Sequence, residues 1–258
     1  AVFHAGGSQY DEVLEAGFTA LKVDLDIRAY GHMSSETAWY DKDKFNMTPN
    51  KWEHNRMVEL AHMVVEAAGE SVDVATDLHT RLDVHSAIRL AQDLEPLKLL
   101  WLEEPIPPEN IDAMLAIREA TSTPICAGEN LYLRHGFRDL LEKQAVSIIM
   151  PDIPKCGGLS ECRKIANMAE IYSIPFAPHN VSSPLGTMAS AHVCATVPNF
   201  LILEYHWFHR EYWSTIITDK RDIIKDGFIQ LDDRPGIGLE LDEEVAKQYQ
   251  YPGTTWFE

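Results

Sequence analysis

The stretch "LLWLEEP", from Leu99 to Pro105, is a short apolar run that ends in two adjacent carboxylates, Glu103 and Glu104. Charge at the end of an apolar segment is costly unless the charged group has a partner. Six other apolar runs in the chain end in the same way, and their last residues are Asp24, Asp77, Glu129, Asp152, His179 and Glu204. The recurrence of this pattern decides the fold.

The run ends recur at a nearly constant spacing. From Asp77 onward they lie 26, 26, 23, 27 and 25 residues apart, whereas Asp24 and Asp77 lie 53 residues apart, about two repeats. The intervals carry apolar residues at three- and four-residue spacing, which is typical of helices that pack on a sheet. Helices are predicted near residues 48–70, 85–94, 111–120, 134–143 and 159–172, the first capped by Thr48 or Asn50. With "AVFHA" at the start as a first strand, the alternation predicts eight parallel strands, the number that closes a (β/α)8 barrel.

All strands of such a barrel point the same way, so the polar run ends should share one mouth, where barrel enzymes hold their active sites. An open doubly wound sheet would also align the strand ends, but the sequence has no glycine-rich phosphate loop. The long polar loop 27–49 is expected either to help bind a substrate or to make only packing or oligomer contacts. Residues 1–205 are therefore predicted to form the barrel, and residues 206–258 a C-terminal tail with a hairpin turned at "DRPGIG".

Composition excludes several classes of partner. The 258 residues carry a net charge of −18, so a nucleic-acid backbone or an anionic membrane is not expected to bind. No stretch has the length and apolarity of a membrane span, and no signal peptide is visible. The four cysteines form no CxxC pair, which predicts reduced, buried thiols and a cytoplasmic protein.

Three of the run ends, Asp77, Glu103 and Glu129, follow one another in equal steps of 26 residues. Three carboxylates that converge on one mouth repel one another unless a cation holds them together. Oxygen ligands of this kind suit Mg²⁺, with Mn²⁺ as a possible substitute. The alternative is that each is an ordinary solvated charge at the end of a strand.

Six motifs carry a family resemblance: "TDLHTR", "WLEEP", "AGEN", "MPDIPKCGG", "APHNVSSP" and "LILEY". From about Ala20 to Leu241, the chain resembles the enolase superfamily in its mandelate racemase-like branch. The resemblance implies a TIM-like (β/α)7β barrel whose metal ligands are Asp77, Glu103 and Glu129. It also implies an N-terminal α+β capping domain, which we expect to be absent or unresolved here. The C-terminal tail would pack on the barrel and on that capping domain.

Within this branch the chain is most similar to the sugar-acid dehydratases that act on galactonate or gluconate. The resemblance implies that His179 is the base, that Asp152 orients it, and that Glu204 hydrogen-bonds the substrate carboxylate. The resemblance also implies that His79 is the general acid. Residues i and i+2 of a strand face the same way, so His79 is expected to face the mouth like Asp77.

Four further positions are candidates for substrate contacts. Lys22 would bind the substrate carboxylate or pair with nearby acids. Asp24 stands where related enzymes carry a second base, and this departure argues against a two-base racemase. Arg81 and Asn180 would contact the substrate or support residues that do.

The implied reaction is a Mg²⁺-dependent loss of water from a sugar acid, by removal of the C2 proton, to give a 2-keto-3-deoxy sugar acid. The enzyme would be a homo-oligomer that acts on a small molecule. Three alternatives stay open: an epimerase or racemase of a hydroxy acid, a barrel glycosidase that uses Glu103 or Glu104 with Glu204, and a non-catalytic barrel.

Overall fold

The computed structural model describes residues 2–3, 14–25, 47–206, 213 and 215–256. Its centre is a six-stranded sheet in which each strand lies parallel to the next strand of the chain. Parallel bridges from Ile149 to Phe176 and from Phe176 to Phe200 continue this wall. The strands are β1 (Val2–Phe3), β2 (Ala20–Asp24), β3 (Asp73–Asp77), β4 (Trp101–Glu103), β5 (Ile125–Ala127) and β6 (Ile148–Ile149).

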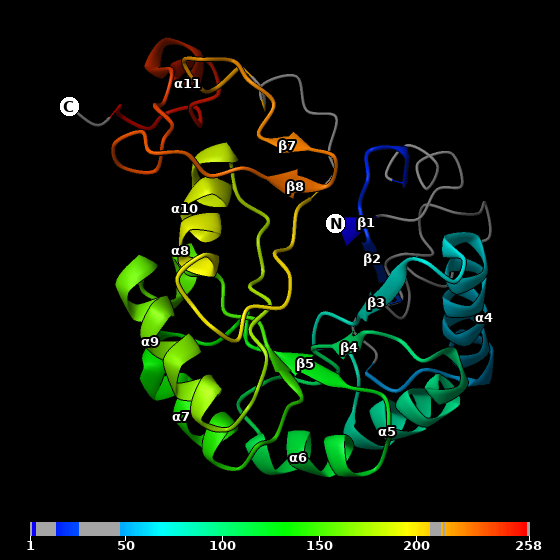
Figure 1. Cartoon of the computed structure of the whole chain (residues 1–258). Helices are drawn as coiled ribbons and strands as arrows, with labels where there is room; N and C mark the ends of the chain where they lie inside the picture. The colour runs from blue at the N-terminus through cyan, green and yellow to red at the C-terminus, as the bar shows by residue number, and fades with distance from the viewer. Residues whose placement is uncertain (1, 4–13, 26–46, 207–212, 214, 257–258) are drawn as a thin grey trace.

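Helices cover the outside of this wall (Figure 1). The chain alternates strand and helix as predicted, and the fold is a TIM-like barrel. The seventh and eighth predicted strands are reduced to the single bridges at Phe176 and Phe200. The helices of this part are α4 (Lys51–Ala68), α5 (Val84–Asp93), η1 (Glu95–Leu97), α6 (Ile111–Glu119), α7 (Leu133–Glu142), α8 (Ile153–Cys156), α9 (Gly158–Ile171) and α10 (Pro184–Cys194).

Local signals fix the start of α4. Asn50 accepts hydrogen bonds from the backbone of Trp52 and Glu53, and the Glu53 side chain accepts one from Asn50 N–H, which completes a capping box. Asn50 is therefore the cap, one of the two predicted candidates. Thr48 instead donates to Asp83, the residue that caps α5.

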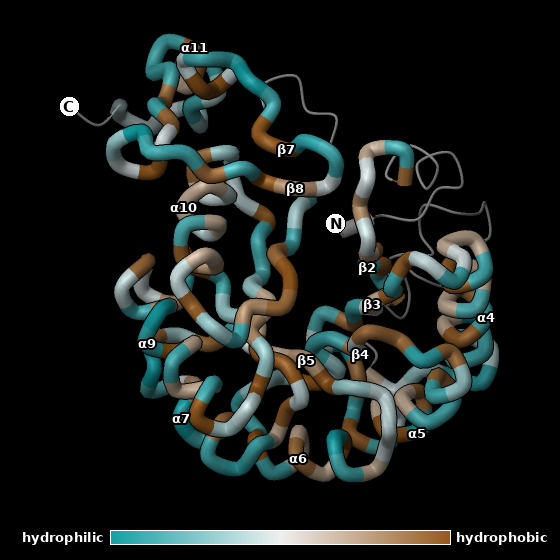
Figure 2. Tube along the Cα trace, in the orientation of Figure 1, coloured by the Kyte–Doolittle hydropathy of each residue, from teal (hydrophilic) through white to brown (hydrophobic). Residues whose placement is uncertain are grey.

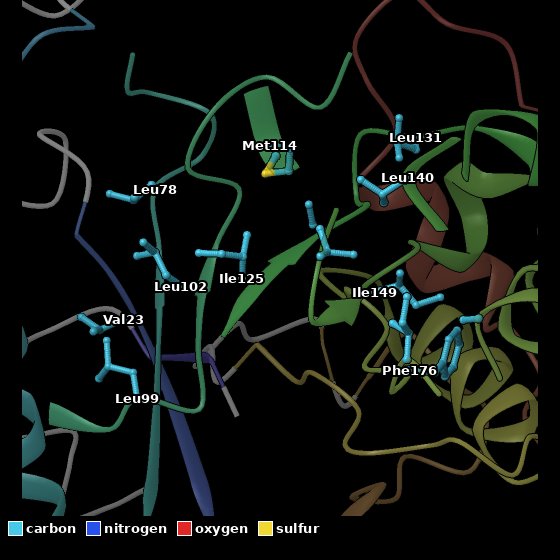
Figure 3. Close-up of a cluster of buried hydrophobic side chains, with 14 of the residues drawn as sticks. Val23, Leu78, Leu99, Leu102, Met114, Ile125, Leu131, Leu140, Ile149 and Phe176 are labelled. Atoms are coloured by element: carbon cyan, nitrogen blue, oxygen red, sulfur yellow. The ribbon is translucent and has the colours of Figure 1, made fainter. Parts of the chain in front are cut away.

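Two apolar layers hold the barrel together. The larger lies between the sheet and the helices, where strand residues such as Leu102 and Ile149 meet helix residues such as Met114 and Leu140 (Figure 3). The hydropathy of the chain follows this arrangement, with apolar strands inside and largely polar helix surfaces outside (Figure 2). A second, inner cluster consists of Ala75, Trp101, Cys126, Ile148, Met150 and Ala177.

The tail differs from the prediction. Its hairpin consists of β7 (Ile224–Lys225) and β8 (Phe228–Ile229), so the turn is at Asp226-Gly227 and not at "DRPGIG". Both turn residues have positive φ, 51° and 75°, and Asp-Gly is a favoured pair in such turns. A Cβ at position 227 would lie 2.2 Å from Gly17 O, so the turn packs tightly on the segment before β2. A short helix, α11 (Glu243–Gln248), follows.

Three further sequence predictions can be compared with the described residues. Most of the predicted loop 27–49 lies outside the described residues. None of the described helices has the length and apolarity needed to cross a bilayer. All four cysteines are buried and free.

Candidate active site at the barrel mouth

Sheet register brings the polar run ends together. Asp24, Asp77 and Glu103 are the last residues of β2, β3 and β4, and Asp77 is in register with both of the others. The remaining run ends lie two to four residues beyond β5, β6 and the bridges at Phe176 and Phe200. Seven charged residues at this end form what we call the mouth cluster: Lys22, Asp77, Glu103, Glu129, Asp152, His179 and Glu204. None of the seven side chains is more than 12% exposed.

Lys22 lies at the centre of the mouth cluster. Its ammonium is 2.6 Å from Glu103 Oε1, 2.9 Å from Glu204 Oε1 and 3.1 Å from Asp77 Oδ2. Burial lowers the pKa of Lys22, but the charges of Glu103, Glu204 and Asp77 outweigh this effect and raise the pKa well above its usual value. Lys22 thus pairs with nearby acids, and its contact with a substrate carboxylate stays a prediction.

The pKa values of the carboxylates around Lys22 do not all shift in the same direction. For Asp77, burial opposes ionisation, yet the charges of Lys22 and His79 hold its pKa far below the usual range. Lys22 likewise lowers the pKa of Glu204 to about 2 against the effect of burial. The pKa of Glu103 is raised, because burial and the charge of Asp77 outweigh the attraction of Lys22. One ammonium therefore does not compensate all of the buried negative charge.

His179 connects the other side of the mouth cluster. Its Nδ1 lies 2.8 Å from Asp152 Oδ2, and its Nε2 lies 2.6 Å from Glu129 Oε2. Asp152 caps α8 with its other oxygen, which accepts from Lys155 N–H and fixes the carboxylate. Burial lowers the pKa of His179, but the charge of Glu204 and the hydrogen bonds with Asp152 and Glu129 raise it to about 10. The same contact with His179 lowers the pKa of Glu129, which burial alone would raise.

Four carboxylates share one arrangement, in which one oxygen accepts a hydrogen bond from a nearby N–H and the other faces a cationic group. Asp77 Oδ1 accepts from His79 N–H at 2.9 Å, and Glu204 Oε2 accepts from Asn180 N–H at 2.9 Å. The donors to Glu103 and Glu129 are side-chain groups, at 2.9 and 3.2 Å. The opposite oxygens face Lys22, except in Glu129, whose other oxygen faces His179. Each of the four carboxylates thus directs one oxygen toward a positively charged group.

His79 lies beside Asp77, although not for the predicted reason. β3 ends at Asp77, and His79 has a left-handed φ of 47°, so the strand alternation does not extend to it. Its Nε2 lies 3.6 Å from Asp77 Oδ2 and 3.9 Å from Asp24 Oδ1. Among the described residues, these three are the group whose ligand atoms all lie within 4.8 Å of one another.

The predicted metal trio is not drawn into one compact group. Asp77 and Glu103 both contact Lys22, whereas Glu129 contacts His179. The donor set still fits a hard divalent cation, because it consists of buried carboxylates that one ammonium and one imidazole balance only in part.

Asn180 and Arg81 differ in their placement. Asn180 is 2% exposed, and its Nδ2 donates to the Glu204 carbonyl and to Thr187 Oγ1, so its contacts support Glu204. Arg81 follows His79 in the same turn, is half-buried, and donates its backbone N–H to Leu78 O. Its contact with a substrate stays a prediction.

Glu104 has a role that the sequence analysis missed. It is fully buried, and its carboxyl accepts hydrogen bonds from Gly128 N–H at 2.7 Å and from Asn130 Nδ2 at 3.4 Å. Asn130 also donates to Glu129, so Glu104 holds the segment that carries Glu129. Burial is the main reason why the pKa of Glu104 is raised to about 7. β4 ends at Glu103 and Glu104 has a left-handed φ of 39°, so strand alternation does not extend to Glu104 and the sequence carries no clear signal for this role.

Comparisons with known proteins identify the family to which the chain belongs. A sequence model of the family described as "Enolase C-terminal domain-like" matches residues 7–245. The chain is 44% identical over 246 residues to a D-xylonate dehydratase of Haloferax volcanii, a match that covers 95% of this chain and 57% of that protein. It is 30% identical to a D-galactonate dehydratase family member of Cellvibrio japonicus, with 96% and 65% covered.

A solved structure gives the same result. The mandelate racemase/muconate lactonizing enzyme-like protein from Rubrobacter xylanophilus superposes with a TM-score of 0.87 at 47% identity, over 98% of this chain and 62% of that one. The chain thus spans about three fifths of the length of these relatives. The parallel barrel and the match over residues 7–245 show that the chain belongs to the enolase C-terminal domain-like family.

Proposed function

We propose that this chain is the barrel of a Mg²⁺-dependent dehydratase that removes water from a sugar acid and forms a 2-keto-3-deoxy sugar acid. One observation carries the proposal: buried carboxylates crowd the mouth around an Asp152–His179 pair with a 2.8 Å contact. The relatives named as sugar-acid dehydratases support this chemistry, and the 44% identical relative makes D-xylonate the first substrate to test.

In this proposal Asp77, Glu103 and Glu129 hold the cation, with Mn²⁺ as a possible substitute for Mg²⁺. The bound cation would stabilise the negative charge that develops on the substrate carboxylate when the C2 proton leaves. This choice is supported because each of the three carboxylates directs one oxygen toward Lys22 or His179. The group Asp24, Asp77 and His79 includes an imidazole nitrogen, which suits Mg²⁺ less well than oxygen does.

His179 Nε2 takes the C2 proton. Asp152 holds Nδ1, fixes the orientation of the ring, and stabilises the imidazolium that forms. A bound divalent cation would offset part of the carboxylate charge that raises the pKa of His179 and would therefore lower that pKa.

The remaining residues bind the substrate and protonate the leaving group. His79 donates a proton to the C3 hydroxyl as it departs, and Asp24, 3.9 Å from its ring, stabilises the protonated form. Glu204 hydrogen-bonds the substrate carboxylate, and Asn180 keeps Glu204 in place. Lys22 attracts the same carboxylate into the mouth, and Arg81 contacts the hydroxyl groups of the sugar acid.

Two further parts of the proposal concern the whole protein. The four buried free cysteines support a location in the reducing cytoplasm. A homo-oligomer is also proposed, and sedimentation of the purified protein tests it.

The deciding experiment is a panel of sugar acids, with D-xylonate, D-galactonate, D-gluconate, D-arabinonate and D-mannonate, incubated with the protein and Mg²⁺. Semicarbazide detects 2-keto-3-deoxy products. We expect one strong substrate. If no acid on the panel loses water while the C2 hydrogen exchanges with D₂O, the proposal is wrong and the chain acts as an epimerase or racemase.

A further inference from the structure

Glu103 has a defined partner for each of its oxygens. The side chain is fully buried, Oε1 lies 2.6 Å from Lys22 Nζ, and Oε2 accepts a 2.9 Å hydrogen bond from Trp101 Nε1. A carboxylate held through both oxygens cannot rotate without breaking one of these contacts. The hydrogen bond from the Trp101 indole to Oε2 therefore determines that Oε1 is the oxygen that faces Lys22.

Trp101 is itself held rigidly. It lies two residues before Glu103 on β4, on the same face of the strand, and it is 5% exposed within the inner cluster. An indole has one donor and no acceptor, and a buried donor needs a partner. Glu103 supplies that partner, so the ring and the carboxylate fix each other.

A small cavity lies beside the Trp101 ring. Trp101 and Lys22 line a cavity of about 20 Å³ inside the barrel, together with Ala75, Met150 and Ala177. A cavity of this size holds one water molecule at most.

We propose that Trp101 is a positioning residue for the cation site: its indole N–H orients the Glu103 carboxylate so that Oε1 faces the mouth, and this orientation strengthens binding of a divalent cation. The inference rests on the proposed function, in which Glu103 is a ligand. Partners that orient metal ligands typically contribute about 10–100-fold to metal affinity. The corresponding donor to Asp77 is the backbone N–H of His79, which only a proline would remove, whereas the donor of Trp101 belongs to its side chain.

The experiment measures the dissociation constant of Mg²⁺ by titration calorimetry in the absence of substrate. Trp101→Phe removes the donor but also shrinks the ring, which would let water reach Glu103. A second variant therefore carries 3-benzothienylalanine at position 101, in which sulfur replaces the N–H at nearly unchanged shape. Trp52→Phe is the matched control, because Trp52 is 47% exposed on α4, outside the mouth cluster.

We expect both changes at position 101 to weaken Mg²⁺ binding by about 10–100-fold, with turnover restored at saturating Mg²⁺, while Trp52→Phe binds as the wild type does. If a folded benzothienylalanine variant binds Mg²⁺ as tightly as the wild type, the inference is overturned and the proposed function stands. If the wild type itself binds no Mg²⁺, the proposed cation site fails, and this inference fails with it.

Discussion

The position of the Lys22 ammonium could not be predicted from the spacing of residues along the chain. The equal steps between the run ends predicted which carboxylates share the mouth, and sheet register explains why Asp77 and Glu103 lie side by side. A lysine side chain is long and flexible, however, so its end point depends on the charges that it meets. In the structure it reaches three carboxylates, including Glu204.

His79 illustrates a different limit at the same scale. Its closeness to Asp77 was predicted from strand alternation, but the strand ends too early and a left-handed turn brings the two together. Two-residue periodicity holds only within a strand, and the sequence does not mark the last residue of β3. The roles assigned to His79, His179 and the other mouth residues stay predictions.

His179→Asn is the direct test of the proposed base. Asparagine keeps a polar group of similar reach but cannot accept the C2 proton, so we expect kcat to fall by about 10²–10⁴-fold with the fold retained. Kinetics on the substrate identified by the panel and circular dichroism check both parts. His62→Asn, an exposed change on α4, is the control. A near-normal kcat in His179→Asn would rule out His179 as the base.

At the scale of elements, helices were easier to predict than strands. The capping box at Asn50 and the apolar stripe of α4 are local signals, and the structure confirms that helix. Strand length depends on pairing with neighbours distant in sequence, so two predicted strands shrink to single bridges. The predicted position of the hairpin turn, "DRPGIG", is wrong, because the pair Asp226-Gly227 is a shorter and stronger turn signal.

The cap of α5 makes a pH-dependent contribution to stability. Asp83 accepts hydrogen bonds from Ser86 N–H, Ser86 Oγ and Thr48 Oγ1, and despite some burial these bonds lower its pKa. Because the folded-state pKa lies below the unfolded-state value, the stabilisation is present above about pH 4 and is lost as the pH falls through the folded-state pKa.

We expect Asp83→Ala to lower the free energy of unfolding by about 1 kcal/mol at pH 7 and by less at pH 3. Urea unfolding at the two pH values measures both effects. Asp83→Asn keeps an acceptor for Ser86 N–H and should cost less than alanine. A cost that is the same at both pH values would contradict the assignment to an ionised cap.

Gly128 links β5 to the proposed metal ligand that follows it. Its φ is +140°, and a Cβ there would lie 2.8 Å from Phe137 Cε1 and 3.3 Å from the backbone of Met150. We expect Gly128→Ala to destabilise the protein by roughly 1–3 kcal/mol and to weaken Mg²⁺ binding, because Glu129 must move. Chemical unfolding and calorimetry measure the two effects.

Gly69→Ala is the matched control for Gly128→Ala. Gly69 also has a positive φ, 71°, but no atom lies within 4 Å of an added Cβ, and it ends α4 before the first residue of β3, whereas the mouth lies at the last residues of the strands. It should show backbone strain alone and normal Mg²⁺ binding. Equal effects of the two changes on Mg²⁺ binding would show that the close packing at Gly128 does not position Glu129.

At the scale of the whole molecule, the barrel gathers charged side chains at a buried position. In the mouth cluster, carboxylates outnumber cationic groups five to two, within a chain whose net charge is −18. Buried charges of one sign oppose folding unless they are compensated. The repeat in the sequence predicted this convergence, because all strands of a closed parallel barrel end at the same mouth.

Cation binding should therefore stabilise the whole fold. A ligand that binds only the folded state at 100 times its dissociation constant contributes about 2.7 kcal/mol, which for a chain of this size raises Tm by roughly 5–10 °C. Differential scanning calorimetry in MgCl₂ and in NaCl of equal ionic strength separates specific binding from screening, and EDTA should reverse the rise. Glu103→Gln should abolish the difference between the two salts, because it removes a buried carboxylate that Mg²⁺ would otherwise compensate. If Tm is the same in both salts for the wild-type protein, the mouth cluster is balanced by its own Lys22 and His179 and the proposed cation site is wrong.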